Sequence, residues 1–241
     1  MNLIKKNKIV AIIPCYKVKK KIDNVLKECL KYFDLVICID DCCPEQSGKY
    51  IKKKFSHSKK IIVLFNKKNM GVGGAVKTGY RYIIKKNFKF AIKIDGDGQM
   101  NPSEYWKLII PMKTKDVYYT KGNRFLYDNY FKKSPKIRFF GNLILTYVAK
   151  FTTGYWKISD PLNGYTCIDT SILKKINFAN VRNDFFFETS MIFLLKNLNI
   201  GIRDVKVKIK YGGEISNFKV YNELIKFIYL HIVYFFRRMI K

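Results

Sequence analysis

Acidic residues are scarce in this chain of 241 residues. Its 18 Asp and Glu residues are outnumbered by 47 Lys and Arg residues, which gives a formal net charge of +29. An excess of this size predicts attraction to an anionic partner, such as nucleic acid, an anionic membrane surface or a phosphorylated substrate. Lys is abundant together with Asn and Ile, as biased genomic base composition would produce, so the alternative is that part of the excess charge carries no function.

Several other features are absent. The six cysteines contain no C-x-x-C pair of the kind found in zinc sites, and the adjacent Cys42 and Cys43 are poorly placed for a disulfide. The N-terminal segment lacks the long apolar core and cleavage site of a secretory signal. We therefore expect reduced thiols in a cytoplasmic protein. The hydrophobic content of 48% supplies a packed core and excludes intrinsic disorder.

Short apolar runs alternate with helix-like stretches along the first half of the chain. The runs are too short for buried helices and rich in β-branched residues, which is typical of strands covered on both faces. This alternation predicts an α/β fold with a parallel sheet and flanking helices. The expected strands are Ile9–Pro14, Leu35–Asp41, Ile61–Phe65 and Phe90–Asp95, and the expected helices are Lys20–Phe33 and Gly73–Lys86.

Polar residues follow three of these strands at the point where each one ends. They are Pro14–Tyr16, Asp40–Asp41 and Asp95–Asp97. In parallel α/β sheets the ligand binds beyond the carboxyl ends of the strands. The sequence therefore predicts a binding site at this edge, within one domain that extends to about residue 215.

The segment Lys93–Pro102 (KIDGDGQMNP) places two carboxylates, those of Asp95 and Asp97, one residue apart. Such close carboxylates repel each other unless a cation lies beside them. Mg²⁺ is commonly held by one or two carboxylates together with substrate phosphates. The neighbouring glycines would let a diphosphate approach the backbone closely. The alternative is an acidic turn in which glycine serves only the backbone conformation.

The segment Asn69–Tyr80 (NMGVGGAVKTGY) is a glycine-rich entry into a helix. It fits neither the dinucleotide-binding fingerprint nor the phosphate loop of nucleotide hydrolases, because its glycines stand at the wrong spacing and follow the third strand. What remains is a tight turn into a helix that carries Lys77 and Arg81. The alternative is a turn without a ligand.

Taken together, these segments resemble the glycosyltransferases of family 2, which have the GT-A fold, and especially their dolichyl- or polyprenyl-phosphate sugar synthases. The similarity runs in order over most of the chain. The matching segments are Ile12–Tyr16, Ile39–Pro44, Asn69–Tyr80, Asp95–Pro102, Lys121–Phe125 (KGNRF), Pro135–Asn142 (PKIRFFGN), Asp160–Thr166 (DPLNGYT), Phe185–Glu188 (FFFE) and Tyr211–Asn217 (YGGEISN). The implied fold is a Rossmann-like, mixed and mostly parallel sheet with flanking helices.

The resemblance also implies roles for individual residues. A divalent metal, Mg²⁺ or Mn²⁺, would be held at Asp95, Asp97 and Gln99. A nucleoside-diphosphate sugar donor would bind at Pro14, Tyr16, Asp40, Asp41, Lys77, Asp95, Gly96, Arg124 and Arg138. Of these, the two arginines resemble ones that such synthases place near donor or acceptor phosphates, a task suited to the bidentate guanidinium fork. Lys17–Val18 stand where the family usually has Asn and Glu.

Two acids of the second half, Asp160 and Glu188, are the candidate catalytic residues. Transfer to a sugar hydroxyl needs a general base within hydrogen-bond reach, whereas a phosphate acceptor is already an anion. Asp160 is either that base or a residue that orients an acceptor loop. Glu188 precedes an apolar helix, so its alternative role is that of an acid favoured by the helix dipole.

The C-terminal residues 216–241 differ from the rest of the chain. The apolar core of this segment, Phe227–Phe236, is interrupted by His231 and is shorter than the roughly 20 residues that a membrane-spanning helix needs. Arg237, Arg238 and Lys241 follow it, which favours an amphipathic helix at a membrane interface. The alternative is a helix docked on its own domain or on a second copy in a homo-oligomer.

These observations predict a cytoplasmic, metal-dependent and inverting glycosyltransferase, peripheral at the inner face of the cell membrane. The expected acceptor is polyprenyl phosphate or a lipid-linked glycan, and the anionic membrane surface is a further expected partner. The rival interpretation is a basic nucleic-acid-binding protein without enzymatic activity. No nucleic acid is expected as a partner, because helix-turn-helix, zinc-finger and aromatic RNA-binding motifs are absent and Lys is spread along the chain.

Overall fold

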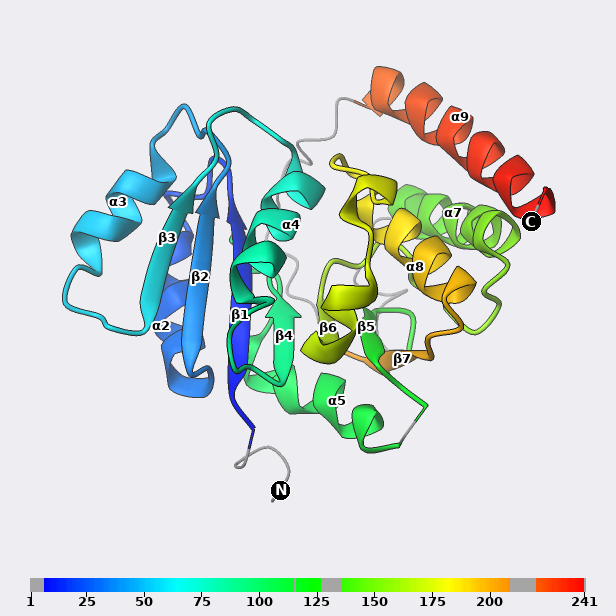
Figure 1. Cartoon of the computed structure of the whole chain (residues 1–241). Coiled ribbons are helices and arrows are strands. Elements are labelled where there is room, and N and C mark those ends of the chain that lie inside the picture. Colours follow the sequence, from blue (N-terminus) through cyan, green and yellow to red (C-terminus); the bar gives the residue numbers. More distant parts are fainter. Residues whose placement is uncertain (1–6, 115, 127–135, 209–219, 241) are drawn as a thin grey trace.

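The computed structural model describes residues 7–114, 116–126, 136–208 and 220–240, with the backbone alone for residues 136–139 and 220–224. A seven-stranded sheet runs through the domain in the order β3-β2-β1-β4-β6-β5-β7 (Figure 1). The strands are β1 (Ile9–Cys15), β2 (Leu35–Asp40), β3 (Ile61–Phe65), β4 (Phe90–Lys93), β5 (Tyr119–Asn123), β6 (Thr166–Asp169) and β7 (Ile202–Lys206).

All but one of the strands run parallel. β1 pairs in parallel with β2 and β4, β2 with β3, and β5 with β7. β6 is antiparallel to both of its neighbours, β4 and β5. The four strands expected from the sequence are present, and the sheet is mixed and mostly parallel as predicted. β5, β6 and β7 are additional strands that the sequence patterns did not reveal.

Helices cover both faces of the sheet (Figure 1). One apolar core joins the sheet to α4 and α8, and a second joins the opposite face to α2 and α5. β1 shows the required alternation, because Val10 and Ile12 belong to the first core while Ile9, Ala11 and Ile13 belong to the second. The helices are α2 (Ile22–Tyr32), α3 (Ser47–Lys54), α4 (Val72–Ile83), α5 (Tyr105–Ile109), α7 (Lys136–Thr153), α8 (Phe187–Asn197) and α9 (Val220–Met239).

Gly79 faces the sheet and lets α4 pack closely on it. A Cβ atom at this position would stand 2.7 Å from the side chain of Ile12 on β1. At the start of the same helix, Gly71 has a φ of +80°, which glycine adopts without strain. The glycines of this segment therefore allow the tight turn before α4 and the close packing of α4 on the sheet.

α9 packs one face on its own domain. Phe227, Leu230 and Tyr234 form an aromatic cluster with Phe186 and with Phe193 of α8. Figure 1 shows α9 lying along α7 at the outside of the molecule, and none of the described helices is long and apolar enough to cross a membrane. One face of α9 therefore docks on its own domain, which is one of the alternatives that the sequence left open.

His231 lies in this buried contact and makes the fold sensitive to acid. Its Nδ1 is 2.7 Å from the Thr152 hydroxyl of α7, and burial lowers its pKa from 6.5 to about 4. Because the folded state binds this proton less tightly than the unfolded chain, the stabilisation is complete above pH 6.5 and is lost as the pH falls toward 4. We expect the unfolding free energy of the wild type, relative to that of His231→Gln, to fall by about 3 kcal/mol between neutral pH and pH 4. Urea denaturation of both proteins at neutral and acidic pH measures it, and parallel pH profiles would contradict the assignment.

Candidate functional site

The carboxyl ends of β1, β2 and β4 meet at one edge of the sheet. Cys15 stands beside Asp40 in the register of β1 and β2, and the Asp41 amide donates to the Cys15 carbonyl at 3.3 Å. Just after β4, the Ile94 amide donates to the Ile12 carbonyl at 3.0 Å. The segments that carry Pro14–Tyr16, Asp40–Asp41 and Asp95–Asp97 are therefore adjacent, as the sequence predicted.

Tyr16 presents an exposed aromatic ring at this edge. Its side chain is 39% accessible, and the Lys17 ammonium lies over the ring, 5.5 Å from its centre. Lys17 adopts a φ of +56° and its amide donates to the Cys43 thiol at 3.1 Å. This contact fixes the turn after β1 against the turn after β2 and leaves the ring open to a planar ligand.

Asp40 and Asp41 are buried and already hydrogen-bonded. The Asp40 carboxylate accepts the amides of Cys43, at 2.8 Å, and Gly48, at 2.5 Å, and so shapes the turn into α3. Asp41 Oδ1 accepts from the Asn66 side chain at 2.7 Å and from the Met70 amide at 2.9 Å. Asp41 thus joins the end of β2 to the glycine-rich segment, while Asp40 has a local structural task.

Asp95 and Asp97 face the same edge. The Asp95 side chain is one-third exposed, and Asp97 Oδ1 accepts the amide of Gln99 at 3.0 Å within a turn in which Gly98 has a φ of +80°. Gly96, between the two acids, packs closely, since a Cβ there would stand 3.1 Å from Val18. Burial, and then the nearby charge of Asp95, raise the pKa of Asp97 above its ordinary value.

The two carboxylates fit a divalent metal. Their mutual repulsion is what a bound cation would relieve, and carboxylate oxygen is a ligand that Mg²⁺ and Mn²⁺ prefer. Among the described residues no group of three or more His, Cys, Asp or Glu side chains is placed to hold a metal. Further ligands would therefore have to come from water or from the oxygens of a diphosphate.

A network of buried ion pairs holds the Asp95 carboxylate in place. The Lys93 ammonium, almost completely buried, is 2.9 Å from Asp95 Oδ1 and 3.0 Å from Glu188 Oε1. The other oxygen of Glu188 is 3.3 Å from the ammonium of Lys121, which also donates to the Asn163 carbonyl. Two strands, β4 and β5, and one helix, α8, are thereby tied together directly behind the metal motif. We call Lys93, Lys121, Asp95 and Glu188 the buried charge network.

The charges of this network stabilise one another. Burial alone would lower the pKa of Lys93, but the carboxylates of Asp95 and Glu188 raise it above its ordinary value. Burial would likewise raise the pKa of Glu188, and the ammonium groups of Lys121 and Lys93 lower it instead. Burial lowers the pKa of Lys121, and Glu188 offsets only part of that effect. The two lysines thus favour the ionised form of Glu188.

Asp160 is paired with Arg124. The guanidinium donates from Nε to Oδ2 and from Nη2 to Oδ1, both at 2.7 Å, and the Arg124 amide also donates to Oδ2 at 2.9 Å. This bidentate pair is buried, so both oxygens of Asp160 are engaged in holding the arginine. The geometry supports the orienting role among the two that the sequence left open.

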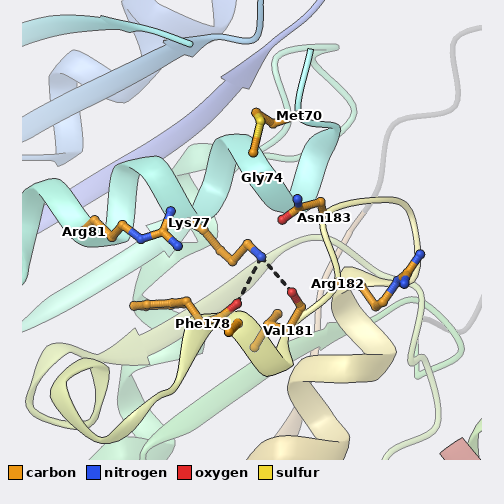
Figure 2. Close-up of a pocket in the computed structure, with 9 residues that line it drawn as sticks. Met70, Gly74, Lys77, Arg81, Phe178, Val181, Arg182 and Asn183 are labelled. Atoms are coloured by element: carbon orange, nitrogen blue, oxygen red, sulfur yellow. Dashed lines mark hydrogen bonds between the residues drawn. The ribbon is translucent and has the colours of Figure 1, made fainter. Parts of the chain in front are cut away.

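The Lys77 side chain points toward the backbone of Phe178 and Val181 (Figure 2). Its ammonium donates to the carbonyls of Phe178, at 3.1 Å, and Val181, at 2.7 Å, and so ties α4 to the segment before α8. A cavity of about 380 Å³ opens beside it, and Arg81 and Arg182 also line that cavity. Burial, and then these two arginines, lower the pKa of Lys77. Arg138 lies in α7, but its side chain is outside the described residues.

Three buried charged residues of this region, Lys93, Lys121 and Asp204, were not identified from the sequence. Lys93 and Lys121 each lie inside a quoted segment, at strand positions where an apolar residue is usual, and this mismatch was the available signal. Asp204 on β7 accepts from the Ser159 amide and the Asn123 side chain, at 2.7 and 2.6 Å, and burial raises its pKa to about 6. No sequence motif distinguished it.

Gly164 makes the close approach of Lys93 and Asp95 possible. A Cβ at this position would overlap the Lys93 ammonium and stand 2.7 Å from Asp95 Oδ2. We expect Gly164→Ala to cost about 1–3 kcal/mol of stability through overpacking. Displacement of Asp95 should lower activity on the order of a hundredfold. Gly141→Ala is the matched control, because its Cβ would meet nothing within 4 Å. Equal activity of the two variants would contradict this role of Gly164.

The fold is that of the glycosyltransferases of the GT-A class. The solved structures that resemble the chain belong to this class. Glucosyl-3-phosphoglycerate synthase of Mycobacterium tuberculosis, solved with Mn²⁺ and UDP-glucose, has a TM-score of 0.68 at 16% identity, over 98% of this chain and 80% of the other. Mannosyl-3-phosphoglycerate synthase of Rubrobacter xylanophilus has a TM-score of 0.68 at 16% identity, over 98% of this chain and 74% of the other.

The chain belongs to glycosyltransferase family 2, because the model of "Glycosyl transferase family 2" matches residues 10–177. Similar curated proteins include the UDP-N-acetylglucosamine–dolichyl-phosphate N-acetylglucosaminyltransferase of Methanococcus voltae, 29% identical over 84% of this chain and 86% of the relative. The undecaprenyl-phosphate mannosyltransferase of Micrococcus luteus is 22% identical over 46% of each chain. The protein is a glycosyltransferase, and the interpretation as a nucleic-acid-binding protein without enzymatic activity was wrong.

Proposed function

We propose that the protein transfers a sugar from a nucleoside-diphosphate donor to polyprenyl phosphate, or to a lipid-linked glycan, at the cytoplasmic face of the membrane. The observation that carries the proposal is the meeting of Tyr16, Asp41 and the Asp95–Asp97 pair at one sheet edge. The two curated relatives support the choice of acceptor, since both are named for transfer to a polyprenyl phosphate.

The donor would lie across the strand ends. The Tyr16 ring would offer a stacking surface for the base, and Asp41 would contact the ribose. Asp95 and Asp97, with Gln99 next to them, would hold the Mg²⁺ or Mn²⁺ and the diphosphate. When bound, the metal would neutralise negative charge as it develops on the departing diphosphate. The buried charge network keeps Asp95 in place for this, so little rearrangement is needed during the reaction.

Arg124 would orient a phosphate near the site. A guanidinium held by two hydrogen bonds to Asp160 loses little conformational freedom when it binds a phosphate of the donor or of the acceptor. Lys17, at the Tyr16 ring, is a further cation at this edge. These cations give the site a preference for anionic ligands.

The ion pairs of the two candidate bases favour a phosphate acceptor over a sugar hydroxyl. Asp160 and Glu188 are both committed to ion pairs with buried cations, whereas a sugar hydroxyl would need a free base within reach. A polyprenyl phosphate already carries the attacking negative oxygen. That oxygen would attack the anomeric carbon opposite the diphosphate in one displacement and invert its configuration.

The proposal is tested by a matrix of donors and acceptors. UDP- and GDP-sugars are incubated with the protein and one of three acceptors: polyprenyl phosphate, a lipid-linked disaccharide or 3-phosphoglycerate. Mass spectrometry identifies the products, with and without excess chelator. We expect chelator-sensitive transfer to polyprenyl phosphate. Transfer to 3-phosphoglycerate alone, or no transfer to either lipid, would contradict the proposed acceptor.

A further inference from the structure

The cavity beside Lys77 lies between α4, with the turn that precedes it, and residues 178–183 of the segment before α8 (Figure 2). We call it the α4 cavity. Its volume of about 380 Å³ falls within the range of roughly 300–1,000 Å³ that is typical of pockets for small ligands. Tyr16, Asp41 and the Asp95–Asp97 pair do not line it, so the α4 cavity is separate from the edge proposed to bind the donor.

The lining of the α4 cavity is positively charged. Lys77, Arg81 and Arg182 belong to it, and none of the lining residues is acidic. Arg182 has a counterion just outside, since its Nη2 is 2.6 Å from Asp184 Oδ2. The Arg81 guanidinium lies over the Phe178 ring, 5.5 Å from its centre, and has no ion-pair partner among the described residues. The charge of the cavity is therefore only partly compensated by the protein.

Lys77 is a buried cation without a counterion. Only 5% of the residue is accessible, and its ammonium donates to two backbone carbonyls, which leaves one of its three N–H groups for another acceptor. Burial, and then the charges of Arg81 and Arg182, lower the pKa of Lys77, and Asp184 offsets only part of this effect. Because a buried charge is costly unless it is paired, an anion bound in the cavity would be stabilised by all three cations.

Two lining residues also hold buried polar atoms that lack a hydrogen-bond partner within the described part of the chain. They are Asn183 Oδ1 and Arg182 Nε. The Asn183 side chain points toward α4, and its Cγ would stand 3.6 Å from a Cβ built at Gly74 (Figure 2). Buried polar atoms of native proteins are usually hydrogen-bonded, so an orphaned one indicates a missing partner. The oxygen of Asn183 needs a donor, such as the hydroxyl group of a ligand.

We propose that the α4 cavity binds a small phosphate ester that carries hydroxyl groups, such as a sugar phosphate. The phosphate would pair with the Lys77 ammonium and the Arg81 guanidinium, and a hydroxyl would donate to Asn183 Oδ1. The Phe178 ring supplies an apolar wall beside them. Water alone would satisfy the Asn183 oxygen but would leave the positive charge uncompensated.

The α4 cavity adjoins the donor edge without being part of it. Met70 lines the cavity, and its amide donates to Asp41 Oδ1 at 2.9 Å. On the other wall, the Asn183 carbonyl accepts the Gly74 amide at 3.1 Å. The segment of Met70 thus contacts both sites, and each can be filled while the other is occupied. The phosphate ester would be a ligand additional to the donor and the acceptor of the proposed function.

The test measures ligand binding to full-length protein by isothermal titration calorimetry. The probes are glucose 6-phosphate, inorganic phosphate and glucose, and the variants are Arg81→Gln and Asn183→Ala. Lys86→Gln is the matched control. It removes the same charge, and the Lys86 ammonium also lies over an aromatic ring, that of Tyr82 at 5.4 Å, but Lys86 does not line the cavity.

We expect glucose 6-phosphate to bind wild type and control equally, and to bind about tenfold more weakly to Arg81→Gln and about fivefold more weakly to Asn183→Ala. Inorganic phosphate should bind more weakly than the ester, and glucose more weakly still. Equal affinity of wild type and Arg81→Gln, or no binding of either phosphate probe, would overturn the site. Glucose that binds as tightly as its phosphate would overturn the anion, and unchanged binding to Asn183→Ala would overturn the hydroxyl contact.

A second titration distinguishes the α4 cavity from the donor edge. Glucose 6-phosphate is titrated into wild-type protein saturated with UDP and Mn²⁺ and into Asp97→Asn, and both should bind it as the free wild type does. Displacement of the ester by UDP would overturn a separate site. Thermal unfolding verifies that each variant is folded, and if one of the two cavity variants fails to fold, the other still decides the question. Binding of the ester without any sugar transfer would contradict the proposed function alone.

Discussion

Asp97→Asn is expected to lower sugar transfer by a factor of about a thousand or more with every donor, because a metal-binding carboxylate is lost where leaving-group charge develops. The substitution is nearly isosteric and retains an oxygen that can accept the Gln99 amide, so the melting temperature should change little. Initial rates at saturating donor and Mn²⁺ measure the effect.

Glu28→Gln is the matched control for this substitution. It removes one carboxylate from an exposed ion pair with Lys31 on α2, and should leave the rate unchanged. Wild-type activity that persists in excess chelator, or an Asp97→Asn enzyme with normal turnover, would contradict the metal-dependent mechanism.

Glu188→Gln is expected to destabilise the protein by about 3–5 kcal/mol, since it leaves two buried ammonium groups without their shared counterion. The side chain is buried and glutamine keeps its shape, so the loss arises from charge rather than from a cavity. The Mn²⁺ concentration for half-maximal activity should rise as well, because Lys93 then pairs with Asp95 alone. Urea denaturation and metal titration of the rate provide the two readouts.

A second substitution distinguishes a positioning residue from a catalytic base. Adding Lys121→Met to Glu188→Gln removes one of the two orphaned charges and should restore part of the stability, with a coupling energy of about 0.5–3 kcal/mol in a double-mutant cycle. If Glu188→Gln instead abolished turnover while the stability stayed that of wild type, Glu188 would be the general base.

The first half of the fold was predictable from the sequence for a physical reason. β1, β2 and β4 are covered on both faces, so their side chains are apolar in succession and their polar residues begin only where the strands end. This rule located both the strands and the edge at which Tyr16, Asp41 and Asp95 meet. The position of these residues at one edge could be predicted from the ends of the strands alone.

The second half did not follow this rule. β5 (Tyr119–Asn123) is completely buried but carries Lys121 and Asn123, which pattern analysis assigns to a surface. Their burial depends on partners far along the chain, Glu188 and Asp204, which only the three-dimensional structure brings close. In the same way, the role of Asp160 depended on Arg124, 36 residues away. Long-range charge pairing has no local periodicity, so a lysine inside a strand pattern signals a buried charge but not which distant acid it pairs with.

The terminal helix illustrates a further limit. Its apolar residues predicted a single buried or membrane-facing side, whereas α9 has an apolar stripe on each side, one on the domain and one outside. Periodicity shows that a helix is apolar but not what each face contacts.

The central claim is that the edge formed by β1, β2 and β4 binds a nucleoside diphosphate through a metal at Asp95 and Asp97. Isothermal titration calorimetry of UDP and GDP into the wild-type protein and Asp97→Asn, each with Mn²⁺ and with chelator, tests it directly. The account predicts binding of one nucleotide to the wild type with Mn²⁺, and at least about tenfold weaker binding on chelation or in Asp97→Asn. Equal affinity under all four conditions, or no binding of either nucleotide, would contradict it.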